Sequence, residues 1–155
     1  MNTLTEEILL QNYQDAHGLT RQVIEAFPEK DLFSFSIGGM RPFSEMIKEF
    51  IGIWDYILAE ALKEQHISLF EQDKFPATKT ELLALRDQVL ISLLSECKMI
   101  QNYGQEISPY QMKFSIAQWI LYIIENETHH RGQAYVYLRA LGIQPPFFWK
   151  RGSFK

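Results

Sequence analysis

Four long stretches of the chain carry apolar residues at steps of three and four, and polar connectors separate them. Such spacing gathers the apolar side chains on one face of an amphipathic helix. The stretches run from Thr3 to about Phe27, from Pro42 to about Gln65, from Thr78 to about Asn102, and from Ser108 or Ser115 to Leu141. One alternating segment, 31–40, is too isolated to build a sheet and is expected to be a loop. The pattern predicts an all-α four-helix bundle.

Local signals mark where these helices begin and end. Residues 78–81 have the spacing of a capping box, in which a Thr hydroxyl and a Glu carboxylate satisfy free backbone donors. Ser108 and Ser115 both fit the start of the fourth helix, and Gly142 suits its end. The loop 28–41 is long enough to cross the end of the bundle, so up-down-up-down order is not required.

Composition narrows the class of protein. With 155 residues, 46% of them hydrophobic, the chain is expected to form one domain over residues 1–155. A net charge of −4 without basic clusters gives no reason to expect nucleic acid as a partner. The single cysteine, Cys97, lies in an apolar helical stretch, so a buried thiol in a reducing compartment is expected. Neither a signal peptide nor a membrane span is evident, which predicts a soluble cytoplasmic protein.

A polar segment, 125–133, interrupts the apolar pattern of the fourth helix and contains two of the four histidines. Helical geometry places Asn126, His130, Gln133 and Tyr137 on one face, while His129 points about 100° away from His130. An imidazole nitrogen is a good ligand for Zn, Ni or Fe. However, a buried histidine also needs hydrogen-bond partners without any metal, and residue chemistry alone leaves both readings open.

The run His129–Pro146 resembles the last helix of the DinB-like superfamily, and Arg41–Glu45 and Tyr13 extend the similarity. The resemblance implies a DinB-like bundle with an up-down-down-up course that is commonly a homodimer. It also implies a divalent metal held by three histidines, one from the second helix and two, four residues apart, from the fourth. Some members of the superfamily are thiol-dependent transferases or isomerases, in which the metal lowers the pKa of a thiol or water.

Carried over to this chain, the three ligand positions fall on Glu49, Asn126 and His130, and only His130 is a histidine. Carboxylate and imidazole together suit Zn, Mn, Ni or Fe, with lower affinity or altered selectivity. A metal-free ion pair between Glu49 and His130, completed by Asn126, is the alternative. Three functions therefore stay open: a metal-dependent enzyme of the thiol-transferase or hydrolase kind acting on a small molecule, a non-catalytic binding module, and a degenerate bundle that acts in protein interaction.

Other polar residues receive separate hypotheses. Gln133 could orient a ligand or water beside His130, and Tyr13 and His17 could line the same cavity. Arg131 is expected to form a salt bridge with Glu96 or Asp15, with an anion-binding role as the alternative. His129 is expected at the surface or an interface, and the dipole of a helix C-terminus accounts for His66. The aromatic segment 147–149 is expected to dock on its own bundle, or else to form a subunit interface.

Overall fold

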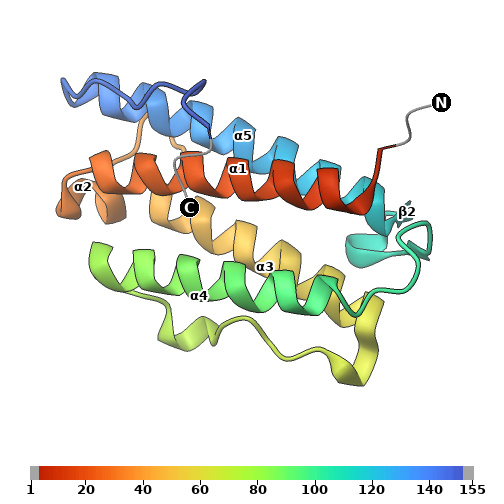
Figure 1. Ribbon diagram of the computed structural model, residues 1–155. Coiled ribbons are helices and arrows are strands. Elements are labelled where there is room, and N and C mark those ends of the chain that lie inside the picture. Colours follow the sequence, from red (N-terminus) through yellow and green to blue (C-terminus); the bar gives the residue numbers. More distant parts are fainter. Residues whose placement is uncertain (1–3, 152–155) are drawn as a thin grey trace.

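The computed structural model describes residues 4–151, and four long helices account for most of them (Figure 1). The long helices are α1 (Glu6–Ala26), α3 (Phe43–Leu62), α4 (Lys79–Cys97) and α5 (Ile116–Ala140). Shorter elements occupy the connections: the α-helix α2 (Glu29–Ser34), the 3-10 helices η1 (Lys63–Gln65), η2 (Gln72–Lys74) and η3 (Pro109–Gln111), and the strands β1 (Glu106–Ile107) and β2 (Phe114–Ser115). The predicted all-α bundle is therefore confirmed.

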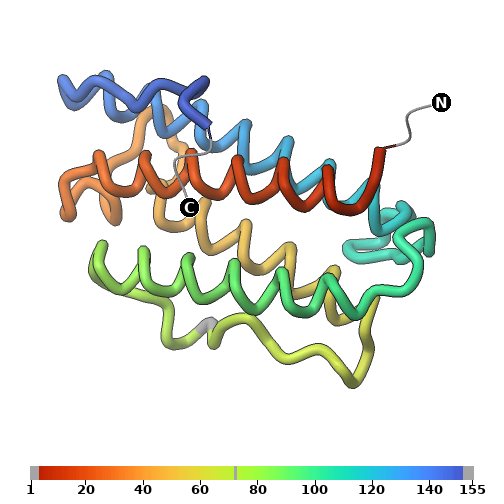
Figure 2. The backbone as a smooth tube through the Cα atoms, in the orientation of Figure 1, coloured from red at the N-terminus to blue at the C-terminus, as the bar shows by residue number. Residues whose placement is uncertain are grey.

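The long helices follow an up-down-down-up course (Figure 1). Helices α1 and α5 run in one direction, and α3 and α4 run in the other. Each of α1 and α3 packs against both α4 and α5. The connection 63–78 returns along the length of the bundle (Figure 2), and this long return allows α3 and α4 to be parallel. Helix α5 consequently has α1 on one side and α3 on the other.

Capping explains why α4 and α5 begin where they do. Glu81 N donates to Thr78 Oγ1 at 3.3 Å, and the Glu81 carboxylate accepts from Thr78 N at 3.2 Å. The same reciprocal pair joins Ser115 and Gln118, at 3.2 and 2.9 Å. Of the two predicted starts for the last helix, Ser115 is thus the cap, and the Ser108 start is wrong because η3 and a two-stranded pair intervene.

The end of α5 follows its glycine. Gly142 has a φ of 76°, and Ile143 N donates to Leu138 O at 2.8 Å, which satisfies one of the last free carbonyls of the helix. Beyond this turn the C-terminal segment folds back along α5 (Figure 1). That return brings residues 148–151 beside the middle of the helix they follow.

One connection differs from the sequence-based expectation. Part of the segment 31–40, expected to be a loop, belongs to α2, which Pro28 precedes and whose Leu32 has no exposed surface. Burial of Leu32 and of the neighbouring Phe43 against the bundle gives this short helix its stability, which local propensity could not supply. The predicted start of the first helix at Thr3 lies outside the described residues; Thr5 caps α1 by accepting from Ile8 N.

Aromatic residues fill much of the core. Trp54, Trp119 and Tyr13 have no exposed surface, and the rings of Tyr13 and Trp54 meet edge to face at 4.9 Å between centroids. Cys97 is buried as expected, and burial raises the pKa of its thiol to about 12, so the thiol is inert at neutral pH. No helix within residues 4–151 combines the length and the apolar character needed to cross a membrane.

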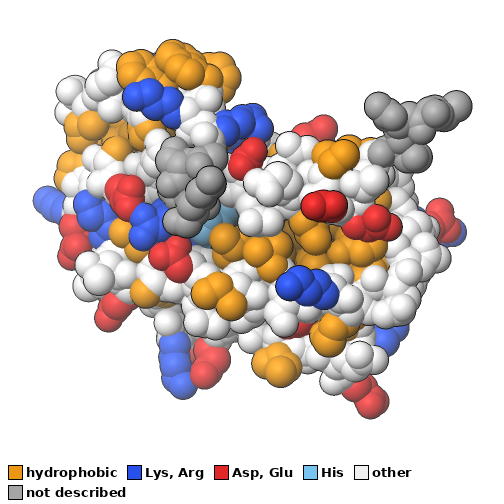
Figure 3. Space-filling model, in the orientation of Figure 1, with side chains coloured by type: hydrophobic (Ala, Val, Ile, Leu, Met, Phe, Trp, Pro, Cys, Tyr) orange, Lys and Arg blue, Asp and Glu red, His pale blue; other side chains and the backbone are white. Residues whose placement is uncertain are grey.

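The aromatic segment 147–149 docks only partly on its own bundle: Phe148 borders a hollow together with residues of α5, but all three rings keep much of their surface exposed. Phe147, Phe148 and Trp149 are 43%, 59% and 63% exposed, and they pack chiefly on one another, with Phe147 stacked on Trp149 at 4.8 Å. The space-filling view shows hydrophobic side chains gathered at the end of the molecule that carries this segment, with Lys and Arg side chains beside them (Figure 3). A subunit interface at this segment stays a prediction.

Candidate functional site

Glu49 on α3 meets Asn126 and His130 on α5. Oε1 of Glu49 accepts a hydrogen bond from Asn126 Nδ2 at 3.2 Å and lies 3.3 Å from His130 Nε2. Asn126 and His130 are one helical turn apart, so the two side chains lie on the same face of α5. The fold thus brings together the three residues that the resemblance assigned to one site. The Glu49 side chain contacts α5 and is not surrounded by solvent.

Gln133 sets the orientation of the His130 ring. Nδ1 of His130 lies 2.6 Å from Gln133 Oε1, an acceptor that calls for a proton on Nδ1. With a proton on Nε2 as well, the ring is the cation that pairs with Glu49; without it, the ring would keep the Nδ1 proton and offer Nε2 to a metal ion, which is the tautomer that a metal-binding histidine needs. Phe50 packs against the same ring with 5.8 Å between centroids and limits its movement.

Glu49 carries a negative charge at neutral pH. Burial alone would raise the pKa of this carboxyl, but hydrogen bonds from Arg41 and Asn126, together with the charges of Arg41 and His130, lower it below its ordinary value. Arg41 Nη2 lies 2.5 Å from Glu49 Oε2, and the Glu49 side chain keeps 30% of its surface exposed. The carboxylate therefore has one oxygen toward Arg41 and the other toward Asn126 and His130.

Tyr137 influences the site indirectly, through its hydrogen bond to the backbone of Arg41. Its hydroxyl donates to the Arg41 carbonyl at 2.9 Å, and its ring packs edge to face against Phe35. These contacts fix the backbone from which the Arg41 side chain extends to Glu49. Tyr137 therefore positions Arg41 and does not touch Glu49 or His130 directly.

A hollow of about 260 Å³ opens beside Glu49. Its lining includes the cationic residues Arg41 and Lys48 and the rings of Tyr56 and Tyr110. These two rings meet edge to face at 5.0 Å. Glu45 and Glu49 line the hollow as well, so its charges balance, and the rings give a small polar molecule an apolar wall.

Tyr110 is held at the hollow by an unusual backbone. Tyr110 and Gln111 have φ values of 55° and 62°, a left-handed conformation that costs energy for residues other than glycine. Ser108 N donates to Glu60 Oε2 at 2.7 Å and anchors the start of this turn to α3. Sequence reasoning missed Tyr110, because the signal lies in the turn that brings it back over α3; Tyr56 could have been found as a residue two turns from Glu49 on the same helix face.

The spacing of Glu49 and His130 suits a divalent ion. Ligand atoms bound at about 2.0–2.1 Å to one tetrahedral ion lie roughly 3.4 Å apart, and Glu49 Oε1 lies 3.3 Å from His130 Nε2. The amide nitrogen of Asn126, which is not itself a ligand, lies 3.2 Å from the same oxygen. Asn126 Oδ1 is buried and has no hydrogen-bond partner among the described residues. A half-turn of the amide would direct this oxygen, rather than the NH2 group, toward Glu49.

The kinds of donor group at the site favour metal binding less than their spacing does. Across residues 4–151, no three His, Cys, Asp or Glu side chains gather where they could hold one ion. The site reaches three donors only by including the neutral amide of Asn126. A divalent ion would also compete with Arg41 for the Glu49 carboxylate, which predicts modest affinity.

The remaining predicted site residues lie elsewhere. His129 is exposed, and its ring packs edge to face on His130 at 5.0 Å. Tyr13 and His17 do not line this site; His17 Nε2 lies 3.0 Å from the Arg86 carbonyl in the interior between α1 and α4. The predicted salt bridge of Arg131 with Glu96 or Asp15 is wrong, because the Arg131 guanidinium donates to neutral acceptors: Ala16 O, Thr20 Oγ1 and Thr128 Oγ1.

A second charged pair lies in the interior between α4 and α5. Arg86 Nη2 donates to Glu127 Oε1 at 2.8 Å, and neither side chain has any exposed surface. Burial alone would lower the pKa of Arg86, but Glu127 and Tyr13 raise it, so the guanidinium stays charged. Sequence reasoning did not single out this pair, since each residue looks like an ordinary member of a polar helix face.

His66 has specific partners beyond the helix dipole that was expected to account for it. Its Nδ1 lies 2.6 Å from Glu96 Oε2 and its Nε2 lies 3.0 Å from Asp55 Oδ1. Asp55 also accepts from Ser68 Oγ and from Leu69 N. The ring thereby joins α3 and the end of α4 to the connection between them.

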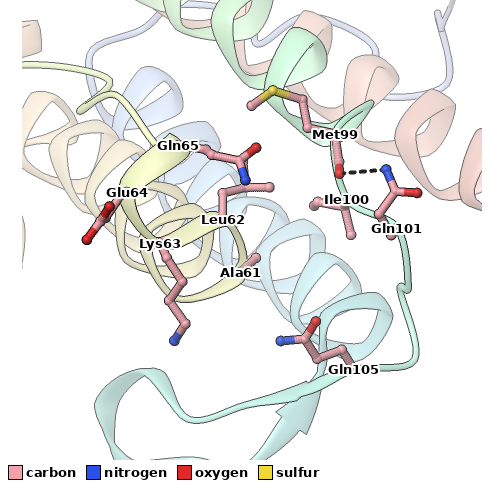
Figure 4. A pocket seen from close by; sticks show the side chains of 9 residues that line it. All are labelled: Ala61, Leu62, Lys63, Glu64, Gln65, Met99, Ile100, Gln101 and Gln105. Atoms are coloured by element: carbon pink, nitrogen blue, oxygen red, sulfur yellow. Dashed lines mark hydrogen bonds between the residues drawn. The ribbon is translucent and has the colours of Figure 1, made fainter.

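A larger hollow, of about 670 Å³, lies between η1 and the segment that follows α4 (Figure 4). Its lining holds amide side chains and aliphatic groups, and Lys63 and Glu64 are its only charged residues. Figure 4 shows Glu64 pointing away from Met99 and Ile100. This hollow lacks the convergent titratable groups that distinguish the Glu49 site.

Comparison with known proteins agrees with this architecture. The model of the DinB family matches residues 1–151. Two crystal structures of DinB-like proteins are similar in fold. The one from Bacillus cereus ATCC 10987 has a TM-score of 0.75 and 16% identity, over 92% of this chain and 97% of that one. The one from Bacillus subtilis has a TM-score of 0.65 and 17% identity, over 90% and 96%. No curated protein matches the chain.

Proposed function

Because the chain belongs to the DinB family, we propose that it binds one divalent transition-metal ion between Glu49, Asn126 and His130 and acts on a small molecule in the adjoining hollow. The observation that carries this proposal is the convergence of the three side chains on one point. A divalent ion, when bound, supplies Lewis acidity that lowers the pKa of a water or a thiol. The proposed chemistry is therefore of the hydrolase or thiol-transferase kind.

The roles of the chain's own residues follow from their contacts. His130 offers Nε2, and Gln133 holds its ring in the required tautomer. Glu49 supplies the anionic oxygen. Lys48 and Tyr110 line the hollow, and their ammonium and phenol groups are the ones that could hydrogen-bond a polar substrate there.

Arg41 favours a second function, in which the site works without metal. Its ion pair with Glu49 already offsets the carboxylate charge, and His130 protonated at both nitrogens would complete a bridge between α3 and α5. Such a bridge would serve binding or interaction and would require no exchangeable ion. Metal uptake decides between the two functions.

The test is metal binding by protein without a histidine tag, stripped with a chelator and then titrated with Zn, Ni or Mn. Elemental analysis after gel filtration should find about one ion per chain, with Zn and Ni preferred to Mn because imidazole is the strongest neutral donor present. His130→Ala and Glu49→Gln should each weaken binding by at least about tenfold. His129→Ala, which removes a neighbouring exposed imidazole, is the matched control and should bind as the parent does.

Asn126→His sharpens the test in the opposite direction. An imidazole in place of the amide should raise affinity, since nitrogen of this type binds these ions more strongly than a neutral amide oxygen. Less than about one-tenth of an ion per chain in the parent protein, with no gain in Asn126→His, would contradict the metal function and leave the metal-free bridge.

A further inference from the structure

A third hollow, of about 350 Å³, lies on the opposite side of α5 from the Glu49 site. One wall comes from α5 itself, and the other comes from the C-terminal segment where it folds back. The residues that line it are Thr128, Arg131, Gly132, Tyr135, Phe148 and Arg151. None of them contributes to the Glu49 site, so the two hollows are independent.

Two guanidinium groups face this hollow without an anionic partner. Arg131 is 6% exposed and forms its hydrogen bonds with neutral acceptors, and no carboxylate lies within ion-pair distance of Arg131 or Arg151 among the described residues. The nearest acidic residue on the same helix face, Glu127, is paired with Arg86. Burial lowers the pKa of Arg131, and the charges of Arg151 and Arg86 act in the same direction, while the charge of Glu127 opposes them without forming an ion pair with Arg131. Two mutually repelling cations at one hollow are stabilised by an anion between them.

Tyr135 adds a free donor to the two cations. Its hydroxyl oxygen is inaccessible to solvent and has no hydrogen-bond partner among the described residues. A buried hydroxyl without a partner carries a cost that a bound acceptor would remove. Burial raises the pKa of Tyr135 despite the opposing charges of Arg131 and Arg139, so the hydroxyl keeps its proton and can donate.

The rest of the hollow suits a flat apolar body. The Phe148 ring, 59% exposed, forms its outer wall. Gly132 forms part of the floor, and a methyl group added there would meet nothing within 4 Å. The absence of a side chain at Gly132 therefore leaves a space along α5 in which a planar group can lie between the helix and the Phe148 ring.

From this arrangement we infer that the hollow binds an aryl carboxylate, with the carboxylate held by Arg131, Arg151 and Tyr135 and the aromatic body packed between Gly132 and Phe148. Arginine binds carboxylates through two parallel N–H donors, which gives such a site directional preference. An inorganic anion would satisfy the cations but leave the apolar wall exposed. The binding of the aromatic body is what distinguishes this site from a general anion site.

The experiment uses the full chain and the probe 2-naphthoate, with 2-naphthamide as its neutral analogue and inorganic phosphate as the charge alone. Titration calorimetry should show one saturable naphthoate site, with the amide and phosphate each at least about tenfold weaker. Equal affinity for naphthoate and naphthamide, or no saturable binding, would overturn the inference.

Variants locate the site. Gly132→Leu fills the space without altering charge and should abolish naphthoate binding, whereas Arg151→Gln should weaken it by about tenfold. Lys98→Gln removes an equal charge from an exposed residue at the end of α4, outside the lining, and should stay within about threefold of the parent. Because Arg131 also holds the backbone of α1, Arg131→Gln could fail to fold, and the Gly132 and Arg151 variants keep the test decisive. Unchanged binding in Gly132→Leu would refute the proposed position.

Discussion

Two charged pairs link α5 to other helices, one to α4 across the interior and one to α3, and they differ in access to solvent. Glu127 meets Arg86 of α4 with no exposed surface on either side chain, while His130 and Asn126 meet a Glu49 of α3 that is 30% exposed and borders a hollow. The buried ring of Phe50 lies between them, 5.8 Å from the His130 ring and 5.9 Å from the Arg86 guanidinium carbon.

This difference in solvent access distinguishes a polar pair that stabilises the fold from one that can take part in a function. A pair without solvent access cannot exchange a ligand or a proton readily, so Arg86 and Glu127 serve to hold α4 and α5 in one arrangement. A pair at the edge of a hollow pays less for desolvation and can exchange its partner for an ion or a substrate. Burial, and not the identity of the residues, therefore marks the Glu49 site as the one to test for chemistry.

The largest effect on stability is expected from breaking the fully buried pair of Arg86 and Glu127. Arg86→Met leaves Glu127 buried without a counter-charge and should lower the free energy of unfolding by about 3–5 kcal/mol, as measured by urea denaturation. The double variant Arg86→Met with Glu127→Leu should recover most of this loss, because no charge then remains in the interior. A loss below about 1 kcal/mol in the single variant would show that the pair is not sealed in solution.

A smaller effect is expected from His17, which contacts the backbone carbonyl of Arg86. Burial lowers the pKa of His17 to about 3, from an ordinary value of 6.5, with the charge of Arg86 acting in the same direction. The unfolded chain takes up a proton below pH 6.5 and the folded chain does not, so stability is full above that pH and is lost as the pH falls toward 3.

At pH 5 this contribution should make the protein about 2 kcal/mol less stable than at pH 7. The comparison is between the parent and His17→Gln, in which the corresponding part of the pH dependence should disappear from urea denaturation curves. His129→Gln, a change at an exposed histidine, should keep the parent's pH profile. An identical profile in His17→Gln and the parent would contradict a neutral, buried His17.

The smallest effect is expected at the open site. Arg41→Gln removes a half-exposed ion pair with Glu49 and should change the free energy of unfolding by less than about 1 kcal/mol. In about 0.5 M salt the difference in the free energy of unfolding between parent and variant should shrink further, because salt screens interactions between exposed charges. A loss comparable to that of Arg86→Met would remove the distinction between the two pairs.

Much of the candidate site followed from helical phase together with the family resemblance. Asn126, His130 and Gln133 share a face because they are three or four residues apart, and this relation holds in any helix that contains them. Glu49 was added through the resemblance, and helical phase supported an inward position for it without excluding a solvated glutamate. Tyr110 escaped notice because a turn with two left-handed residues, and not a repeat in the sequence, brings it to the hollow.

The sequence by itself determined the four amphipathic helices, their capping boxes and the glycine that ends α5, because each depends on residues within a few positions of one another. The tertiary structure alone decided which polar residues meet. Arg86 and Glu127 are 41 positions apart, and Arg131 binds Ala16 across 115. Such pairs form only after the helices have packed. The same packing seals Glu127 in the interior and leaves Glu49, an equally ordinary glutamate in the sequence, at the edge of a hollow where a ligand can reach it.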